Sequence, residues 1–240
     1  TLPQQWPGAA LAYLPSYFGV DLRVTVAGQP GPQVGEVAAR ARAELMELVG
    51  DVVYAEDERT MEEALGEALV ARGWRVATAE SCTAGLLSKR LTDVPGSSRY
   101  FDRGFVTYSN DAKVELLGVS EGDIAAHGAV SAPIAEQMAH GARHRAGVDL
   151  GIAITGVAGP EGGSDEKPVG TVFVALSAAA GETVRRFQQS GSRATIRERS
   201  VQFALDLARR RLLDLPLEAQ LGEPPARAAA PAPRRAAPAA

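Results

Sequence analysis

The hydrophobic pattern of the first 56 residues predicts a small α/β module. Residues 20–28 alternate apolar and polar side chains, as a strand with one covered face does. Residues 34–50 carry apolar side chains at helical spacing and end on Gly50, and residues 51–55 have the composition of another short strand. Strand, helix and strand form one α/β unit, so we place a domain at residues 1–56.

A longer α/β pattern begins at Thr60. This threonine is placed as an N-cap with Glu63 three residues later, the spacing of a capping box, and its helix should end near Gly73. Strands are then predicted at residues 74–81, 101–109, 149–159 and 170–178, a hairpin turn at Gly181 and Glu182, and helices at residues 82–94, 111–118, 131–147 and 193–215. This order predicts an α/β fold, with a mixed sheet flanked by helices in three α/β/α layers over residues 57–215.

Composition and charge narrow the class of protein. The chain is 45% hydrophobic and 22% charged, as ordinary soluble globular proteins are, and its net charge of −4 argues against a main role in gripping nucleic acid. A single cysteine allows no intrachain disulfide, and neither a membrane span nor a signal peptide is visible, so we expect a cytoplasmic protein.

The two ends of the chain carry little pattern. Residues 1–16 begin with Thr1 and open no helix or strand, so we expect a fragment of a longer protein. Residues 216–240 are rich in alanine and proline and have nothing to bury, so we expect this tail to be disordered.

Four polar or glycine-rich clusters follow predicted strands or open a helix, at residues 79–85, 107–113, 155–170 and 191–197. Ligands of open α/β sheets bind beyond the carboxyl ends of the strands, so these clusters can converge on one site. The glycine-rich cluster has neither the P-loop spacing nor the dinucleotide fingerprint, but it lets backbone N–H groups approach an anion. The three histidines form no HExxH motif, and no metal or cofactor is predicted.

Individual residues of these clusters have two interpretations. Ser81 is either a nucleophile or the cap of the next helix, and its position alone favours the cap. Cys82 has no histidine nearby in the sequence, and a buried thiol is its ordinary role. Glu80, at a strand end, is placed to orient a base or bind a ribose hydroxyl.

Taken together, the clusters favour a hydrolytic site. Ser81, Tyr108 and Lys113 allow a hydroxyl nucleophile to be deprotonated by a lysine whose pKa is lowered by burial, while the phenol relays a proton or fixes the geometry. Backbone N–H groups at the start of the helix after Ser81, or in the glycine-rich loop, would bind the oxyanion. Arg193 and Arg197, four residues apart at a helix start, suit a phosphate.

Residues 79–119, 127–131, 154–176 and 191–197 together closely resemble the C-terminal domain of the CinA family, in unbroken order from about Thr60 to about Leu212. The resemblance implies a homodimeric nicotinamide-nucleotide amidase that converts nicotinamide mononucleotide to nicotinic acid mononucleotide and ammonia, without a metal, in pyridine nucleotide recycling. It makes Ser81 the nucleophile and Tyr108 and Lys113 its activating partners. It also implies substrate contacts, which we assign to Glu80, Thr83, Thr155, Gly156, Gly159, Arg193 and Arg197.

One residue departs from the family pattern, and the first 56 residues point to alternatives to an enzyme. Ala84 stands where the family usually has a second glycine, which narrows the approach of a ligand to the backbone without removing a reacting group. The first 56 residues look like the KH-like middle module of longer CinA proteins, so an interaction module for recombination proteins or nucleic acid is the alternative to an enzyme. The GQPG stretch at Gly28–Gly31 fits the GXXG loop of KH domains, but it lacks adjacent lysines and favours a plain turn. A nucleotide hydrolase is weaker still, since no carboxylate cluster for magnesium is visible.

Overall fold

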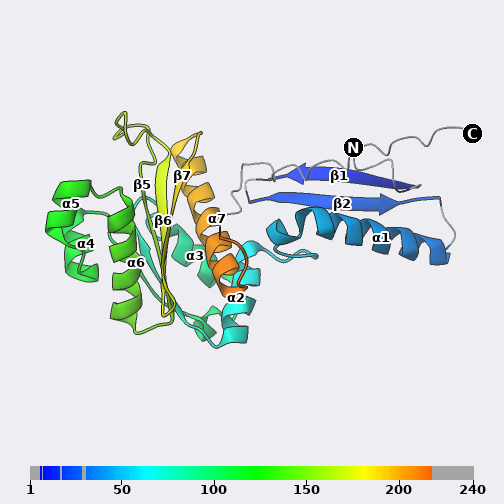
Figure 1. The fold of residues 1–240 in the computed structure, drawn as a ribbon, viewed down its shortest axis with the longest axis horizontal. Helices are drawn as coiled ribbons and strands as arrows, with labels where there is room; N and C mark the ends of the chain where they lie inside the picture. The colour runs from blue at the N-terminus through cyan, green and yellow to red at the C-terminus, as the bar shows by residue number, and fades with distance from the viewer. Residues whose placement is uncertain (1–5, 7, 17, 29–30, 218–240) are drawn as a thin grey trace, which may run out of the picture.

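The computed structural model describes residues 6, 8–16, 18–28 and 31–217, which contain two separate sheets (Figure 1). The smaller sheet pairs β1 (Ala9–Pro15) antiparallel with β2 (Val20–Val26), and α1 (Gly31–Val49) packs against it. Trp6, Ala41 and Leu45 form the buried centre of this module. A two-stranded sheet is marginal by itself, so α1 supplies the apolar cover that the hairpin needs.

The predicted strand at residues 20–28 and the predicted helix at residues 34–50 are confirmed, but the order of elements in the first module is different. Residues 51–55 form no strand. The segment begins in a short 3-10 helix, η2 (Gly50–Val52), and the carbonyls of Asp51 and Val53 accept hydrogen bonds from Arg209 instead of from a neighbouring strand. The unpredicted strand β1 takes the place beside β2. Three of its seven residues are alanine, which has a low preference for strands, so the pattern was weak. Residues 29–30 of the GQPG stretch and 218–240 of the predicted tail lie outside the described residues.

The larger sheet is mixed, as predicted, with strand order β4-β3-β5-β6-β7. Its strands are β3 (Val76–Glu80), β4 (Phe101–Val106), β5 (Leu150–Gly156), β6 (Thr171–Ala178) and β7 (Gly181–Gln188). Strand β3 pairs in parallel with β4 and β5, whereas β6 is antiparallel to both of its neighbours. The hairpin turn falls two residues earlier than predicted, at residues 179–180, because Ala178 already pairs with Gly181 and Glu182 lies inside β7.

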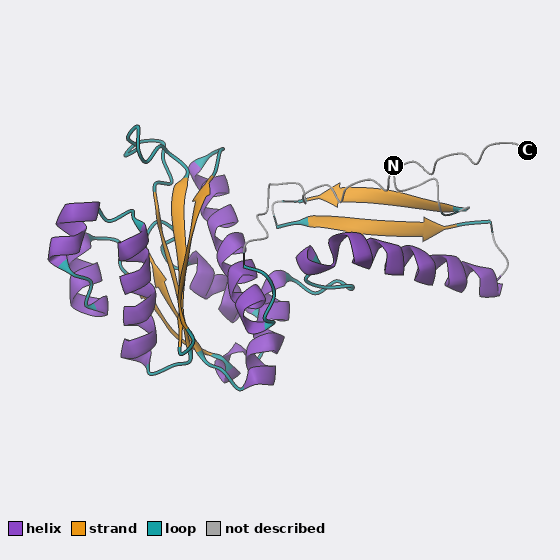
Figure 2. Ribbon diagram, in the orientation of Figure 1, coloured by secondary structure: helices purple, strands orange, loops and turns teal. Residues whose placement is uncertain are grey.

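Helices cover both faces of this sheet, which gives the predicted three layers (Figure 2). One face is packed by α2 (Met61–Arg72), α3 (Leu86–Asp93) and α7 (Arg193–Leu212), and the other by α4 (Asn110–Leu117), α5 (Glu121–His127) and α6 (Ala132–Ala146). The side chains of each strand alternate between two apolar cores, so Ile152 and Ile154 face α7 while Ala153 faces α6. Of these six helices, α5 alone was not predicted from the sequence.

Local signals at helix ends decide where the helices begin and stop. Thr60 and Glu63 form the predicted capping box, and Gly73 ends α2 in the left-handed region at φ 65°. Ser131 is the N-cap of α6 as predicted, but its hydroxyl donates to the Gly128 carbonyl instead of capping the helix. Among the residues that the structure describes, no helix combines the length and apolarity needed to cross a membrane.

The parallel strands β3, β4 and β5 end at one edge of the large sheet. The chain segments that follow these strands therefore meet there, and they contain three of the four predicted clusters. The fourth cluster, at the start of α7, reaches the same edge through hydrogen bonds from Arg193 and Arg197 to the other loops. The fold thus brings all four clusters to one edge, as expected for an open α/β sheet.

Candidate active site

Ser81 and Lys113 meet at the end of β3, although 32 positions separate them in the chain. Ser81 directly follows β3, and its backbone N–H donates to the Ile154 carbonyl of β5 over 3.0 Å. Lys113 lies in the first turn of α4, a helix capped by the Ser109 hydroxyl. Its side chain is only 1% exposed, and its Nζ lies 3.2 Å from Ser81 Oγ. The two groups that sequence analysis paired as base and nucleophile are therefore within hydrogen-bond distance.

Backbone carbonyls, and no carboxylate, surround the amine of Lys113. Its Nζ donates to the Thr107 carbonyl over 2.9 Å and to the carbonyls of Tyr108 and Ser109 over 3.4 Å each. Within the described part of the chain, Lys113 forms no ion pair. Burial therefore dominates and lowers the pKa of Lys113 from its ordinary value. A larger share of this amine is neutral near pH 7 than in an exposed lysine.

Cys82 is buried next to this pair, and its environment keeps the thiol protonated. Burial raises the pKa of Cys82 to about 11. Only a thiolate is an effective nucleophile, so Cys82 fits the role of a packed thiol that the sequence suggested.

Glu80 lies on the face of β3 that packs against α3, and it is fully buried. Its Oε2 accepts from the N–H groups of Gly85 and Leu87, and its Oε1 accepts from the N–H and hydroxyl of Ser88, all over 2.7–3.0 Å. Four donors occupy the carboxylate, so its observed partners are the start of α3 and not a base or an open ligand site. The predicted substrate contact of Glu80 has no support from these bonds.

The occupied carboxylate also changes the prediction for the oxyanion. The helix-start N–H groups that we expected to bind an oxyanion are taken, since Glu80 binds those of Leu87 and Ser88 and the Thr83 carbonyl accepts from Leu86. By contrast, no hydrogen bond among the described residues uses the backbone N–H of Cys82 or Thr83 with another residue. Donors for an oxyanion next to Ser81 are thus in the turn before α3, not in α3 itself.

Tyr108 and Arg193 form a second pair at the edge of the site. The Tyr108 ring is 60% exposed, and its hydroxyl accepts from Arg193 Nη2 over 3.1 Å. The other terminal nitrogen, Nη1, donates to the Gly159 carbonyl over 2.9 Å. The structure therefore joins the phenol to Arg193 and the glycine-rich loop, while the backbone carbonyl of Tyr108, not its hydroxyl, contacts Lys113.

Arg197 contacts the turn that carries Ser81. Its Nη2 donates to the Thr83 carbonyl over 2.7 Å. The hydroxyl of Thr83 and the Nε of Arg197 are buried, and within the described chain neither has a hydrogen-bond partner. Both residues are thus at the predicted site, but their observed bond is to each other.

Thr155 holds two loops together. Its buried hydroxyl donates to the Ala129 carbonyl over 2.8 Å, which ties the end of β5 to residues 127–131. Gly156 has no room for a side chain, because a Cβ there would lie 2.8 Å from Val172 and 2.9 Å from the Thr171 carbonyl. Sequence reasoning missed Ala129 and Thr107, since both act through backbone carbonyls that no side-chain motif reveals.

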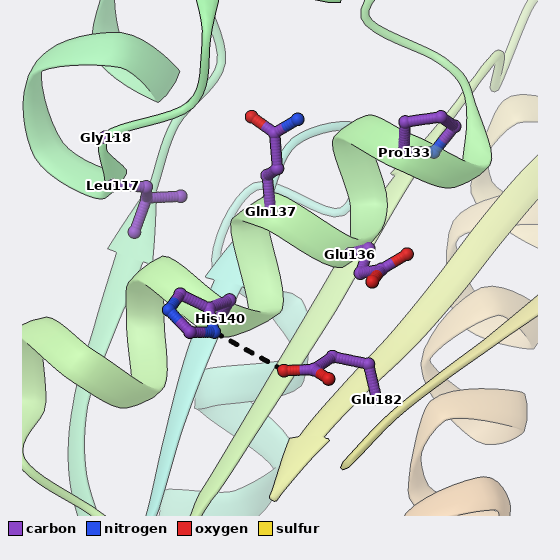
Figure 3. A pocket seen from close by; sticks show the side chains of 7 residues that line it. All are labelled: Leu117, Gly118, Pro133, Glu136, Gln137, His140 and Glu182. Carbon is purple, nitrogen blue, oxygen red and sulfur yellow. Dashed lines mark hydrogen bonds and ion pairs between the residues drawn. The ribbon is translucent and has the colours of Figure 1, made fainter.

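A groove of about 380 Å³ lies away from these residues, along α6 (Figure 3). Its lining includes Gly118, His140 and Glu182, and the His140 ring points toward Glu182 with Nδ1 3.4 Å from the carboxylate. Glu182 pairs with Ser177, which pairs with Gly151 near the start of β5, so this part of the groove is at the opposite end of the sheet from Ser81. We therefore assign the candidate chemistry to the Ser81–Lys113 pair, not to the groove. No group of three or more His, Cys, Asp or Glu residues in the described ranges could hold a metal ion.

Comparisons with known proteins agree with this architecture. The family model of the CinA C-terminal domain matches residues 58–212. A CinA-like protein of Geobacter sulfurreducens is 46% identical over 206 residues, which are 86% of this chain and 50% of that protein. A putative competence-damage inducible protein of Symbiobacterium thermophilum is 49% identical over 184 residues, 73% of this chain and 43% of that protein. The chain thus spans about half the length of the curated relatives that it matches.

Solved structures show the same fold. The competence/damage inducible protein CihA from Agrobacterium tumefaciens is 42% identical with a TM-score of 0.59, and the match covers 64% of this chain and 96% of that one. A CinA superfamily protein from Escherichia coli is 34% identical with a TM-score of 0.61, and the match covers 69% of this chain and 98% of that one. With the family model covering more than half of its residues, the chain belongs to the CinA family and contains its C-terminal domain.

Proposed function

We propose that this protein is a nicotinamide-nucleotide amidase, which hydrolyses the carboxamide of nicotinamide mononucleotide to nicotinic acid mononucleotide and ammonia. The observation that carries the proposal is the 3.2 Å separation of Ser81 Oγ and the Lys113 Nζ, together with the burial of that amine away from any carboxylate. A lysine with a lowered pKa beside a serine hydroxyl is the arrangement that a histidine-free serine hydrolase requires. The choice of substrate comes from the family resemblance.

In the proposed reaction, Lys113 begins as a neutral amine. It accepts the hydroxyl proton of Ser81 while Oγ bonds to the amide carbon, which makes a tetrahedral intermediate with a negative oxygen. Lys113 then donates the proton to the amide nitrogen, the carbon–nitrogen bond breaks, and ammonia leaves an ester on Ser81. Lys113 next takes a proton from water while the resulting hydroxide attacks the ester. The bond from the acyl carbon to Oγ breaks, Lys113 returns its proton to Ser81, and the carboxylic acid product leaves and ionises to the carboxylate in solvent.

The backbone N–H groups of Cys82 and Thr83 are the proposed donors to the negative oxygen. They directly follow the nucleophile, and neither gives a hydrogen bond to another described residue. Donors fixed in a turn need no reorganisation during the reaction, so each stabilises the transition state by about 3–4 kcal/mol.

Arg193 is the proposed contact for the phosphate of the nucleotide. Its guanidinium is exposed and already spans the Tyr108 hydroxyl and the Gly159 carbonyl, so a phosphate can add a charged partner without first breaking an ion pair. Arg197 is a weaker candidate because the Thr83 carbonyl holds it.

Incubation with nicotinamide mononucleotide, with ammonia and nicotinic acid mononucleotide measured as products, tests the proposal. We expect turnover by the native chain and none by Ser81→Ala. Lys113→Ala should also abolish turnover, and Lys89→Ala is its matched control, because the Lys89 amine pairs at the surface with Asp93 and with no other described carboxylate. Full activity in Ser81→Ala would reject the assignment of the nucleophile, and no product from the native chain would reject the substrate.

A further inference from the structure

Glu80 connects both ends of the turn that carries the nucleophile. This turn, residues 81–85, joins β3 to α3. Glu80 is the last residue of β3, so it precedes the turn, and its carboxylate accepts from the N–H of Gly85 at the far end and from Leu87 and Ser88 beyond it. The Glu80 side chain therefore links the two ends of the turn through hydrogen bonds, and Ser81 lies between these ends.

The arrangement differs from an ordinary helix cap. Helices are usually capped by the residue directly before their first turn, but Gly85 holds that place in α3, has φ 93°, and offers no side chain. The cap comes instead from a strand residue five positions earlier. A cap of this kind fixes the start of α3 relative to the end of β3, which a local serine or aspartate at the cap position does not do.

Residues of three elements surround the Glu80 carboxylate and accommodate its hydrogen bonds. The Ser88 hydroxyl donates to Glu80 over 2.7 Å and lies 2.7 Å from the Thr78 hydroxyl on the same face of β3. The neighbouring strand β4 leaves room for both hydroxyls by having Gly104, where a Cβ would lie 2.2 Å from Ser88 Oγ. Strands β3 and β4 and helix α3 thus all contribute to a polar cluster in which Thr78 and Glu80 are fully buried and Ser88 is partly buried.

We propose that Glu80 is a positioning residue for the nucleophile, which holds Ser81 at the distance from Lys113 that proton transfer needs. It touches neither Ser81 nor Lys113 through its carboxylate, so it acts through the turn. The proposal rests on the proposed function only in taking Ser81 as the nucleophile, and it holds for any acyl substrate. A displacement of about 1 Å at a reacting atom can lower a rate by about 100-fold, and that is the loss we expect from Glu80→Gln.

Glu80→Gln is the informative variant because it keeps the size of the side chain. Its amide places an N–H₂ donor against backbone N–H donors that need acceptors. The substitution therefore weakens the hydrogen bonds between residue 80 and the start of α3 without leaving a cavity. The matched control is Glu62→Gln. Glu62 of α2 forms a partly buried ion pair with Arg90, which lies on α3 but away from the turn.

The rate at which a fluorophosphonate labels Ser81 is the first readout, with Ser81→Ala as the blank, and kcat and KM for nicotinamide mononucleotide are the second. We expect Glu80→Gln to lower the labelling rate and kcat about 100-fold with little change in KM. Glu62→Gln should leave the labelling rate and kcat near their native values, even if it lowers the unfolding midpoint as much as Glu80→Gln does. A labelling rate in Glu80→Gln that matches that of Glu62→Gln would overturn the positioning role.

The two readouts separate the two proposals. Normal labelling of Ser81 without release of ammonia would reject the amidase and leave the role of Glu80 decided by the labelling rates. If the native chain is not labelled at all, Ser81 has no reactivity to position and both proposals fail. If Glu80→Gln does not fold, Ser88→Ala takes its place. It removes one of the four donors, and an unchanged labelling rate would then overturn the proposal.

Discussion

Two groups of buried cations show opposite ways of placing positive charge inside this protein. Near the end of α7, Arg209 and Arg210 are 2% and 1% exposed, and both bind the Asp206 carboxylate, over 2.8 and 2.7 Å. They also donate to the carbonyl of Asp51, over 3.1 and 3.0 Å. Lys113 is buried to the same degree, but its hydrogen-bond partners within the described chain are carbonyls and a serine hydroxyl.

The difference between them is a counterion. A buried cation with a bonded carboxylate stays charged, and removing one partner leaves an uncompensated charge. A buried cation without a carboxylate is destabilised in its charged form, so its pKa falls and the amine becomes available as a base. The arginine cluster therefore keeps its charge beside η2, whereas burial of Lys113 costs stability and, in the proposed mechanism, leaves an amine that can act as a base.

Lys113→Met should give the largest effect, because it removes the proposed base and keeps the volume of the side chain. Loss of one member of a catalytic pair that acts as a unit costs up to about 10⁶-fold in kcat, and a Ser81→Ala, Lys113→Met double variant should lose no more. We also expect the free energy of unfolding at pH 7 to rise, because methionine carries no charge to desolvate. Steady-state kinetics and urea unfolding measure the two effects, and a less stable Lys113→Met would break the contrast with the arginine cluster.

The same variant has a pH signature. The pKa of Lys113 is lower in the folded protein than the value of 10.5 in an unfolded chain, so the unfolded state binds more protons between these two pKa values. The free energy of unfolding of the native chain should therefore gain a rising contribution across that window as pH increases. The contribution is missing in Lys113→Met, and urea unfolding from pH 7 to 11 measures the difference.

Asp206→Asn should have the second largest effect, and it should lower stability while leaving kcat unchanged, the opposite of Lys113→Met. It leaves Arg209 and Arg210 without their carboxylate, which costs about 3–5 kcal/mol of stability. The kcat of the folded protein should stay near the native value, because Ser81 and Lys113 keep their contacts. A kcat that falls in parallel with the unfolding midpoint would show that the two regions are coupled.

Ala84→Gly should have a smaller effect, confined to the turn that carries Ser81. Ala84 is exposed and has φ 49°, in the left-handed region that favours glycine. Glycine relieves the strain but has a more flexible unfolded state, so we expect a net gain of about 0.5–1 kcal/mol in the free energy of unfolding. Thermal unfolding checks this, and Ala180→Gly, in the hairpin turn, is the control for the added flexibility. An equal or greater loss of stability in Ala84→Gly would argue that the turn is not strained.

Cys82→Ser should have the smallest effect on kcat, because the thiol lies beside Lys113 but has no part in the proposed reaction. With a pKa of about 11, only about one thousandth of Cys82 is thiolate at pH 8, so alkylation by iodoacetamide should be slow until the chain unfolds. Mass spectrometry of native and urea-unfolded samples measures this. Rapid alkylation of the folded protein together with loss of activity would move the proposed nucleophile from Ser81 to Cys82.

Sequence patterns predicted the larger domain better than the first module. The apolar runs at β5 and β6 and the capping box at Thr60 are strong local signals, and the structure confirms each of them. The alanine-rich β1 and the extended residues after η2 gave weak or misleading signals, because partners elsewhere in the chain decide whether such segments pair. The domain boundaries, the homodimer and the cytoplasmic location stay predictions.

The sequence by itself determined the fold class, the family and four segments that can meet at one edge of the sheet, because the succession of strands and helices along the chain and the capping signals are local patterns. Only the tertiary structure decided the pairing within that edge. It joined Lys113 to Ser81, gave the Tyr108 hydroxyl to Arg193, and turned Glu80 toward α3. These outcomes depend on which face of a strand a side chain occupies and on how deeply neighbouring elements bury it, and both are set by contacts between residues far apart in the chain.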